Sequence, residues 1–156
     1  MLLLIQLVTQ AQKETDFNMS TLMSSKLGLK AGIAFYKALY SFEKGDKVAS
    51  VGAGTGVREV IYSMTDDSLT LYIQDIDTAS WKSKLITQLA IRQYDLAERP
   101  VTATFRLIVG TEFETRLPKA TLDKVILEHS LHEFTQQMQM LTDIRTKLRP
   151  DGRLFV

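Results

Sequence analysis

Three glycines at alternating positions, in the run VGAGTG at 51–56, form the segment best suited to hold a ligand. Glycine tolerates positive φ and has no Cβ, so a ligand can approach the backbone closely. A dinucleotide-binding turn needs glycine at position 57, where Val57 stands, and a P-loop needs a lysine that does not follow here. The run therefore predicts a strand-to-helix turn that holds a nucleoside-type cofactor. The alternative is a tight turn with only a structural role.

Asp75 is the second candidate, nineteen residues after Gly56 and at the end of a predicted strand over 69–73. A carboxylate in this place can accept hydrogen bonds from both hydroxyls of a ribose. Asp77 could take over this role. The alternative is that Asp75 caps the following helix in solvent.

A third group, Glu128, His129, His132 and Glu133, follows the fourth predicted strand. Histidine can act as a general base near neutral pH, so His129 or His132 could activate a methyl acceptor or a similar nucleophile. The spacing fits no zinc motif, and the chain has no cysteine. We therefore expect no metal site.

Strands that alternate with helices are expected to position these residues. The predicted strands cover 48–51, 69–73, 101–109, 122–127 and 153–156, with a turn at 149–152 before the last. The first predicted helix covers 19–42 and is divided at Gly28 and Gly32, and the second covers 56–64. The third begins at a Thr78 cap and runs through Trp81 to Arg92. The fourth has an apolar face formed by Phe134, Met138, Leu141, Ile144 and Leu148. This order predicts a doubly wound, Rossmann-like α/β/α sandwich with a parallel sheet. Ligands bind such sheets beyond the carboxyl ends of the strands.

Four segments together carry a family resemblance. VASVGAGTG followed by LYIQDID resembles motifs I and II of class I S-adenosylmethionine-dependent methyltransferases. LIVGTEFETRLPKATLDKVILEHSLHEF is similar to the third-strand to fourth-strand region, and DIRTKLRPDGRLFV to the helix, turn and fifth strand that follow. The resemblance covers about residues 33–156, and it implies the sheet order 3-2-1-4-5 and S-adenosylmethionine as cofactor.

The resemblance also assigns roles to positions. The glycine turn would cradle the methionine end and the ribose, Asp75 would bind the ribose hydroxyls, and Ile76 would pack on adenine. Thr111 and Glu112 fall near the adenine amino group, and Leu127 and Glu128 near the methionine moiety. The implied cofactor-binding positions are Gly52, Ala53, Gly54, Thr55, Gly56, Asp75, Ile76, Thr111, Glu112, Leu127 and Glu128. In related sequences, a histidine in the loop of His129 often has no catalytic role.

Departures from the family pattern keep a second function open. Ser50 stands where the family usually has Asp or Glu, and Thr111 stands at a position that is often acidic. The expected function is methyl transfer from S-adenosylmethionine to an unidentified acceptor, most simply a small molecule. The alternative is a non-catalytic methyltransferase-fold module with lost or weakened cofactor binding.

Composition limits the partners. The 156 residues are 45% hydrophobic and 24% charged with a net charge of +1, as in a single globular domain without a signal for nucleic acid. Residues 1–14 begin with MLLLIQLV and resemble a partial signal peptide, although a packed strand or helix is an alternative. Eight residues are too few for a membrane span, which needs about 20. The compartment stays open, and we assign the methyltransferase-like domain to 15–156.

The family usually continues past the fifth strand, whereas this chain stops at Val156 inside the predicted strand. We therefore expect a truncated or minimal form. Its fifth strand would expose an unpaired edge, which favours self-association.

Overall fold

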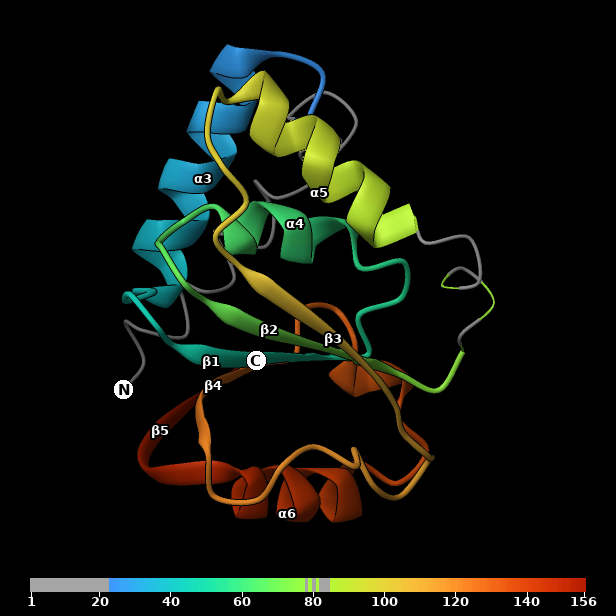
Figure 1. Ribbon diagram of the computed structural model, residues 1–156. Coiled ribbons are helices and arrows are strands. Elements are labelled where there is room, and N and C mark those ends of the chain that lie inside the picture. Colours follow the sequence, from blue (N-terminus) through green and yellow to red (C-terminus); the bar gives the residue numbers. More distant parts are fainter. Residues whose placement is uncertain (1–22, 78, 80, 82–84) are drawn as a thin grey trace.

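The computed structural model describes residues 23–156, apart from 78, 80 and 82–84. The predicted apolar segment 1–14 and the predicted helix cap Thr78 lie outside the described residues. The described chain forms one parallel sheet in the order β3-β2-β1-β4-β5, with helices on both faces (Figure 1). The predicted fold class and sheet order are confirmed.

The elements alternate along the chain as the hydrophobic pattern predicts. The strands are β1 (Lys47–Val51), β2 (Thr70–Asp75), β3 (Thr104–Val109), β4 (Leu122–Ile126) and β5 (Leu148–Phe155). The helices are α3 (Lys26–Tyr40), α4 (Val57–Ser63), α5 (Leu85–Leu96) and α6 (Gln137–Lys147), with a 3₁₀ turn, η2, at Leu131–Glu133. None of the described helices is long and apolar enough to cross a membrane.

The sheet separates two hydrophobic clusters. Helices α3, α4 and α5 lie on one face and α6 lies on the other (Figure 1). Neighbouring residues of β1 supply opposite faces: Val48 belongs to the cluster under α3–α5, and Ala49 to the cluster under α6. The first cluster is the larger and contains the buried tyrosines Tyr36, Tyr40 and Tyr62. The two faces are therefore unequal in buried area.

The predicted division of the first helix at Gly28 and Gly32 is wrong. Helix α3 runs without a break through both glycines, and the Ser25 side chain caps it by accepting a hydrogen bond from the Gly28 amide at 3.1 Å. A glycine inside a helix costs about 1 kcal/mol relative to alanine. Burial of Leu29 and Tyr36 on the same helix offsets this cost.

The predicted apolar face of the last helix is also wrong in part. Met138 is 76% exposed, whereas Met140 and Ile144 are buried. The helix begins only at Gln137, because Phe134 has extended backbone after the η2 turn. Of the predicted face, only Met138 departs: Ile144 is buried, and Phe134, Leu141 and Leu148 pack in part against the same cluster.

The predicted turn at 149–152 lies inside β5. Leu122 on β4 pairs with Leu148, but Lys124 pairs with Arg153, so the register shifts between these two pairs. A longer stretch of β5 faces a shorter stretch of β4, which is the geometry of a bulge. The residues that favour a turn, including Gly152, therefore bend the strand without ending it.

Candidate functional site

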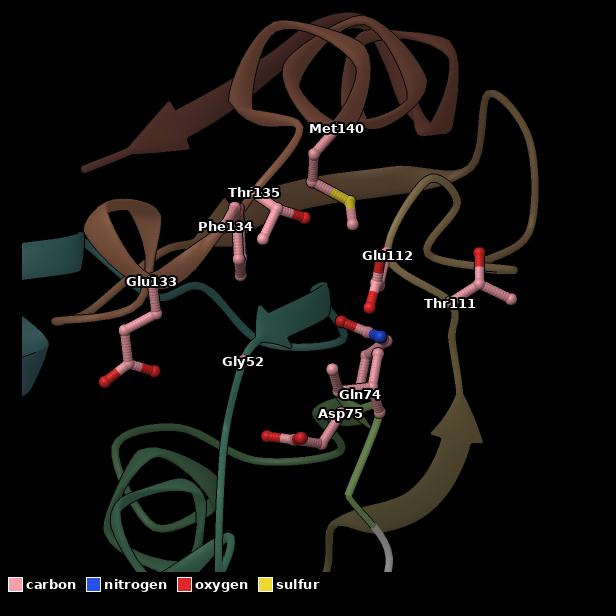
Figure 2. Close-up of a pocket in the computed structure, with 10 residues that line it drawn as sticks. Gly52, Gln74, Asp75, Thr111, Glu112, Glu133, Phe134, Thr135 and Met140 are labelled. Carbon is pink, nitrogen blue, oxygen red and sulfur yellow. The ribbon is translucent and has the colours of Figure 1, made fainter.

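A cleft lies beyond the carboxyl ends of β1, β2 and β3 and is closed on the other side by the segment between β4 and α6 (Figure 2). This is where the strand order reverses, because β1 lies between β2 and β4. Its volume is about 230 Å³. The lining residues are Gly52, Gln74, Asp75, Ile76, Thr111, Glu112, Glu133, Phe134, Thr135 and Met140.

The three glycines of the turn all have positive φ but differ in their surroundings. A Cβ on Gly52 would lie 2.5 Å from the Ser130 Cβ, and one on Gly56 would lie 2.6 Å from the Ile86 Cδ1. A Cβ on Gly54, with φ +57°, would meet nothing within 4 Å. The missing Cβ of Gly52 leaves room for the Ser130 side chain and that of Gly56 for the end of the Ile86 side chain, whereas Gly54 leaves open space that a ligand could occupy.

Backbone and side-chain bonds hold the turn against its neighbours. The amides of Gly52 and Ala53 both donate to the Gln74 carbonyl oxygen at 3.0 Å. The buried Ser130 hydroxyl donates to the Val51 carbonyl oxygen at 2.6 Å. The end of β2 and the segment after β4 therefore fix the turn from two sides.

Asp75 ends β2 as the sequence predicts and lies beside the glycine turn. Its Oδ2 accepts a hydrogen bond from the Gly54 amide at 2.6 Å, and its Oδ1 accepts one from the Asp77 amide at 2.9 Å. An ionised carboxylate has about four acceptor sites, so these two bonds leave capacity for two hydroxyl donors.

The remaining predicted positions around adenine also line the cleft. Ile76 is 57% exposed and offers an apolar surface. The Thr111 hydroxyl accepts hydrogen bonds from the Phe113 and Glu114 amides at 3.2 and 3.0 Å, so this residue shapes its own loop. Glu112 is exposed at the cleft, and its side chain is directed toward Gln74 (Figure 2).

The cleft is acidic. Asp75, Glu112 and Glu133 line it, and no lysine or arginine is among its described lining residues. Carboxylates at close quarters favour a ligand that carries positive charge.

Of the glycine turn only Gly52 lines the cleft, and Ala53, Gly54, Thr55 and Gly56 do not. Four predicted site residues outside the turn do not line it either. Leu127 is buried, and its amide donates to the Phe155 carbonyl oxygen at 2.9 Å. His129 and His132 are exposed, with the His132 Nε2 4.0 Å from the Glu133 Oε1. The role of these three residues stays a prediction.

Glu128, the fourth, is directed into a cluster of tyrosines. Its Oε2 accepts hydrogen bonds from the hydroxyls of Tyr40, at 2.9 Å, and Tyr62. Its Oε1 lies 3.5 Å from the Tyr36 hydroxyl and 3.4 Å from the Arg58 Nε. Burial, with the Glu128 charge as a further cause, raises the pKa of all three phenols, so they remain neutral donors.

A second carboxylate lies next to the glycine turn without facing the cleft. Glu59 is buried, and burial raises its pKa to about 7, which a hydrogen bond with Ser50 opposes. Its Oε2 makes no hydrogen bond to any described residue. The position of Ser50, where the family usually has an acid, is thus beside a carboxylate contributed by α4.

Within the described ranges, no group of three histidine, cysteine, aspartate or glutamate side chains is arranged to hold a metal ion.

Sequence patterns missed several residues of the site. Gln74 is buried at the cleft, and only its position next to Asp75 could have pointed to it. The sequence pattern assigns Phe134 only to an apolar helix face and Met140 to no role, because nothing in it distinguishes a cleft-lining apolar residue from a core residue. The Trp81 indole nitrogen donates to the Gly54 carbonyl oxygen at 3.1 Å, although its spacing favours a helix residue that packs on the sheet.

Comparison with known families gives one match, in which residues 50–156 fit the model described as "Methyltransferase domain". This is more than half of the chain. None of the curated proteins compared with the chain matches it.

Many solved structures share the fold. The YcgJ protein from Bacillus subtilis matches with a TM-score of 0.53 at 15% identity, over 80% of this chain and 49% of that one. A SAM-dependent methyltransferase from Aquifex aeolicus matches with a TM-score of 0.58 at 16% identity, over 94% and 69%. The [4+2]-cyclase SpnF matches with a TM-score of 0.55 at 15% identity, over 81% and 43%. At such identities the likeness shows the fold alone, and the chain spans about half the length of most of these proteins.

Proposed function

Because the chain belongs to the methyltransferase domain family of transferases, we propose that it uses S-adenosylmethionine to methylate a small-molecule acceptor. One observation carries this proposal. Asp75 lines an acidic cleft at the end of β2, and it accepts a hydrogen bond from the amide of Gly54, the neighbouring turn residue with open space at its Cβ position.

The residues of the cleft and of the adjoining glycine turn fit the cofactor. Gly54 would let the ligand approach the backbone, and Asp75 would accept hydrogen bonds from the ribose hydroxyls with its remaining acceptor sites. Ile76 would pack on adenine, next to Thr111 and Glu112. When bound, the cofactor supplies a methyl group that its sulfonium already activates. The chain itself has to orient the acceptor and exclude water.

The charge of the cleft supports the same choice. S-adenosylmethionine carries one more positive charge than the product, S-adenosylhomocysteine. Asp75, Glu112 and Glu133 therefore favour the cofactor over the product on electrostatic grounds. A preference of this kind helps product release.

A base role for His129 or His132 is compatible only with an acceptor bound beside the segment after β4, because neither side chain lines the cleft. We propose the small-molecule class because a net charge of +1 gives no signal for nucleic acid. The domain boundary at residue 15 is likewise a proposal.

A second candidate is a non-catalytic module with this fold. Ser50 in place of the usual acid favours it, and the likeness to a [4+2]-cyclase illustrates that the fold hosts more than one reaction. A module of this kind would fold stably and bind neither cofactor nor product.

Titration calorimetry with S-adenosylmethionine and S-adenosylhomocysteine tests the proposal. We expect both to bind, and Asp75→Asn to weaken binding by about tenfold or more, because hydrogen bonds to a charged acceptor contribute about 1.5–3 kcal/mol. Asp95→Asn, at an exposed position of α5, is the matched control and should bind normally. A folded wild-type chain that binds neither compound would exclude the proposal and favour the module.

A further inference from the structure

Four hydrogen bonds join the glycine turn to the loop after β2 in a ring, which the covalent chain closes between Ala79 and Trp81. Asp75 accepts from the Gly54 amide at 2.6 Å and from the Asp77 amide at 2.9 Å. Asp77 in turn accepts from the Ala79 amide at 2.9 Å. The Trp81 indole nitrogen donates a hydrogen bond to the Gly54 carbonyl oxygen at 3.1 Å. Both ends of the ring meet at one glycine.

Gly54 depends on these bonds for its orientation. No atom lies within 4 Å of its Cβ position, so side-chain packing does not hold this residue, whereas it does hold Gly52 and Gly56. Its amide is fixed by Asp75 and its carbonyl by Trp81. A glycine has the widest choice of backbone conformations, so loss of either bond lets the turn reorient.

Trp81 is suited to this role and is the only tryptophan in the chain. Its ring packs in part against the core cluster under α3–α5, which limits the positions of the indole N–H. An indole nitrogen only donates, so it pairs with a carbonyl and cannot compete for the amide that Asp75 uses.

We propose that Trp81 is a positioning residue for ribose recognition, acting through Gly54 on Asp75. The bond from Trp81 holds the Gly54 peptide, whose amide holds one carboxylate oxygen of Asp75 and leaves the other acceptor sites in place for the ribose hydroxyls. This inference rests on the proposed use of S-adenosylmethionine, and it names a residue outside the cleft lining that sets the affinity of the site.

The first test uses Trp81→Phe, which keeps an aromatic ring and removes the N–H donor. S-adenosylhomocysteine should bind about fivefold to tenfold more weakly, as for the loss of one hydrogen bond. The substitution should reduce the affinity for the 2′-deoxy analogue by a smaller factor, because this ligand lacks one of the ribose hydroxyls whose recognition the variant impairs. A purely structural role would weaken both ligands equally and would overturn the proposal.

A double-mutant cycle gives an independent readout. If Trp81 acts through Asp75, the double variant should lose less binding free energy for S-adenosylhomocysteine than the sum of the losses in Trp81→Phe and Asp75→Asn alone. Additive effects would contradict the proposed route.

Amide hydrogen exchange on the ligand-free protein separates this inference from the proposed function. The Gly54 amide should exchange several-fold faster in Trp81→Phe than in the wild type, and Asp77→Ala, which opens the ring elsewhere, should have the same effect if Trp81→Phe folds poorly. Wild type that fails to bind S-adenosylhomocysteine would refute the cofactor proposal, and therefore ribose recognition as well. Unchanged exchange at Gly54 in both variants would refute the ring itself.

Discussion

At the scale of single residues, the glycine turn shows that one residue type serves two purposes within a few positions. Gly52 has no Cβ because Ser130 occupies that space, and the Ser130 hydroxyl is held by the Val51 carbonyl. Gly54 has no such neighbour. The absence of a side chain at Gly52 is therefore a requirement of packing, whereas at Gly54 it leaves open space beside Asp75.

Alanine substitutions should separate these purposes. Gly52→Ala should destabilise the protein strongly, because the new Cβ would overlap Ser130. Gly54→Ala should cost only about 1–2 kcal/mol, from the left-handed backbone, but should weaken binding of S-adenosylhomocysteine at least tenfold. Urea denaturation and calorimetry measure the two effects. Similar losses of stability in both variants would contradict this distinction.

Glu59 makes stability depend on pH in the opposite direction to most carboxylates. Its pKa is about 7 in the folded protein against an ordinary value of 4.5, because burial disfavours the charge. As pH rises from about 4.5 to about 7, the unfolded chain loses the proton first and becomes relatively more stable. The contribution is fully present below 4.5 and is lost by the time pH passes 7.

Glu59→Gln should remove this dependence. The free energy of unfolding of the variant, relative to the wild type, should rise between pH 4 and pH 8 by on the order of 3 kcal/mol, since one pKa unit corresponds to about 1.4 kcal/mol. Denaturant titrations across this range check the difference. Asp66 and Asp143, whose pKa values are lowered by hydrogen bonds, are present in both proteins and cancel. A difference that does not change with pH would contradict the buried state of Glu59.

At the scale of elements, Glu128 connects three parts of the chain. It follows β4 and binds Tyr36 and Tyr40 from α3 and Tyr62 from α4. The aromatic rings also contact one another, with the centroids of Tyr36 and Tyr62 4.8 Å apart in an edge-on arrangement. The cluster therefore fastens two helices to the end of a strand.

Tyr62→Phe should lower the free energy of unfolding by about 1.5–3 kcal/mol, because it removes a buried hydrogen bond to a carboxylate while keeping the ring. Tyr72→Phe, on β2 outside this cluster, is the matched control and should change stability by less than about 0.5 kcal/mol. Thermal unfolding with both variants distinguishes them. An equal effect of the two substitutions would show that the hydrogen bond from Tyr62 to Glu128 does not stabilise the fold.

The elements themselves were largely predictable, because alternating apolar runs and turn residues act locally. The strand before the glycines and Asp75 at the end of β2 were predicted correctly from this pattern, whereas the sheet order followed from the family resemblance. Met140 could not be predicted at the cleft, because the apolar pattern that places it on the buried face of α6 does not distinguish a core residue from one that also lines a ligand site. Trp81 could not either, because its bond to Gly54 spans 27 positions and depends on how a loop folds back.

At the scale of the whole molecule, the sheet is bordered by β3 and β5. Leu154 on β5 is 39% exposed and lies at this second border. A strand at the edge of a sheet offers unpaired backbone groups that can pair with another chain. We therefore propose that the protein associates with itself through β5.

Light scattering at increasing protein concentration should show this association, and Leu154→Lys should reduce it, because a charged side chain discourages edge-to-edge pairing. Leu27→Lys, at an even more exposed apolar position on α3, is the control and should leave it unchanged. A wild type that stays monomeric at high concentration would refute the proposal.

The unequal faces of the sheet have a consequence for how the cleft opens. Ala53 of the glycine turn packs against the cluster covered by three helices, whereas Phe134 and Met140 at the cleft belong to the cluster covered by α6 alone. Cooperative units with less buried apolar surface unfold locally at lower free energy. The wall of the cleft on the α6 side is therefore expected to unfold locally while the other wall stays folded. A ligand that contacts both walls should then slow proteolysis of the α6 half.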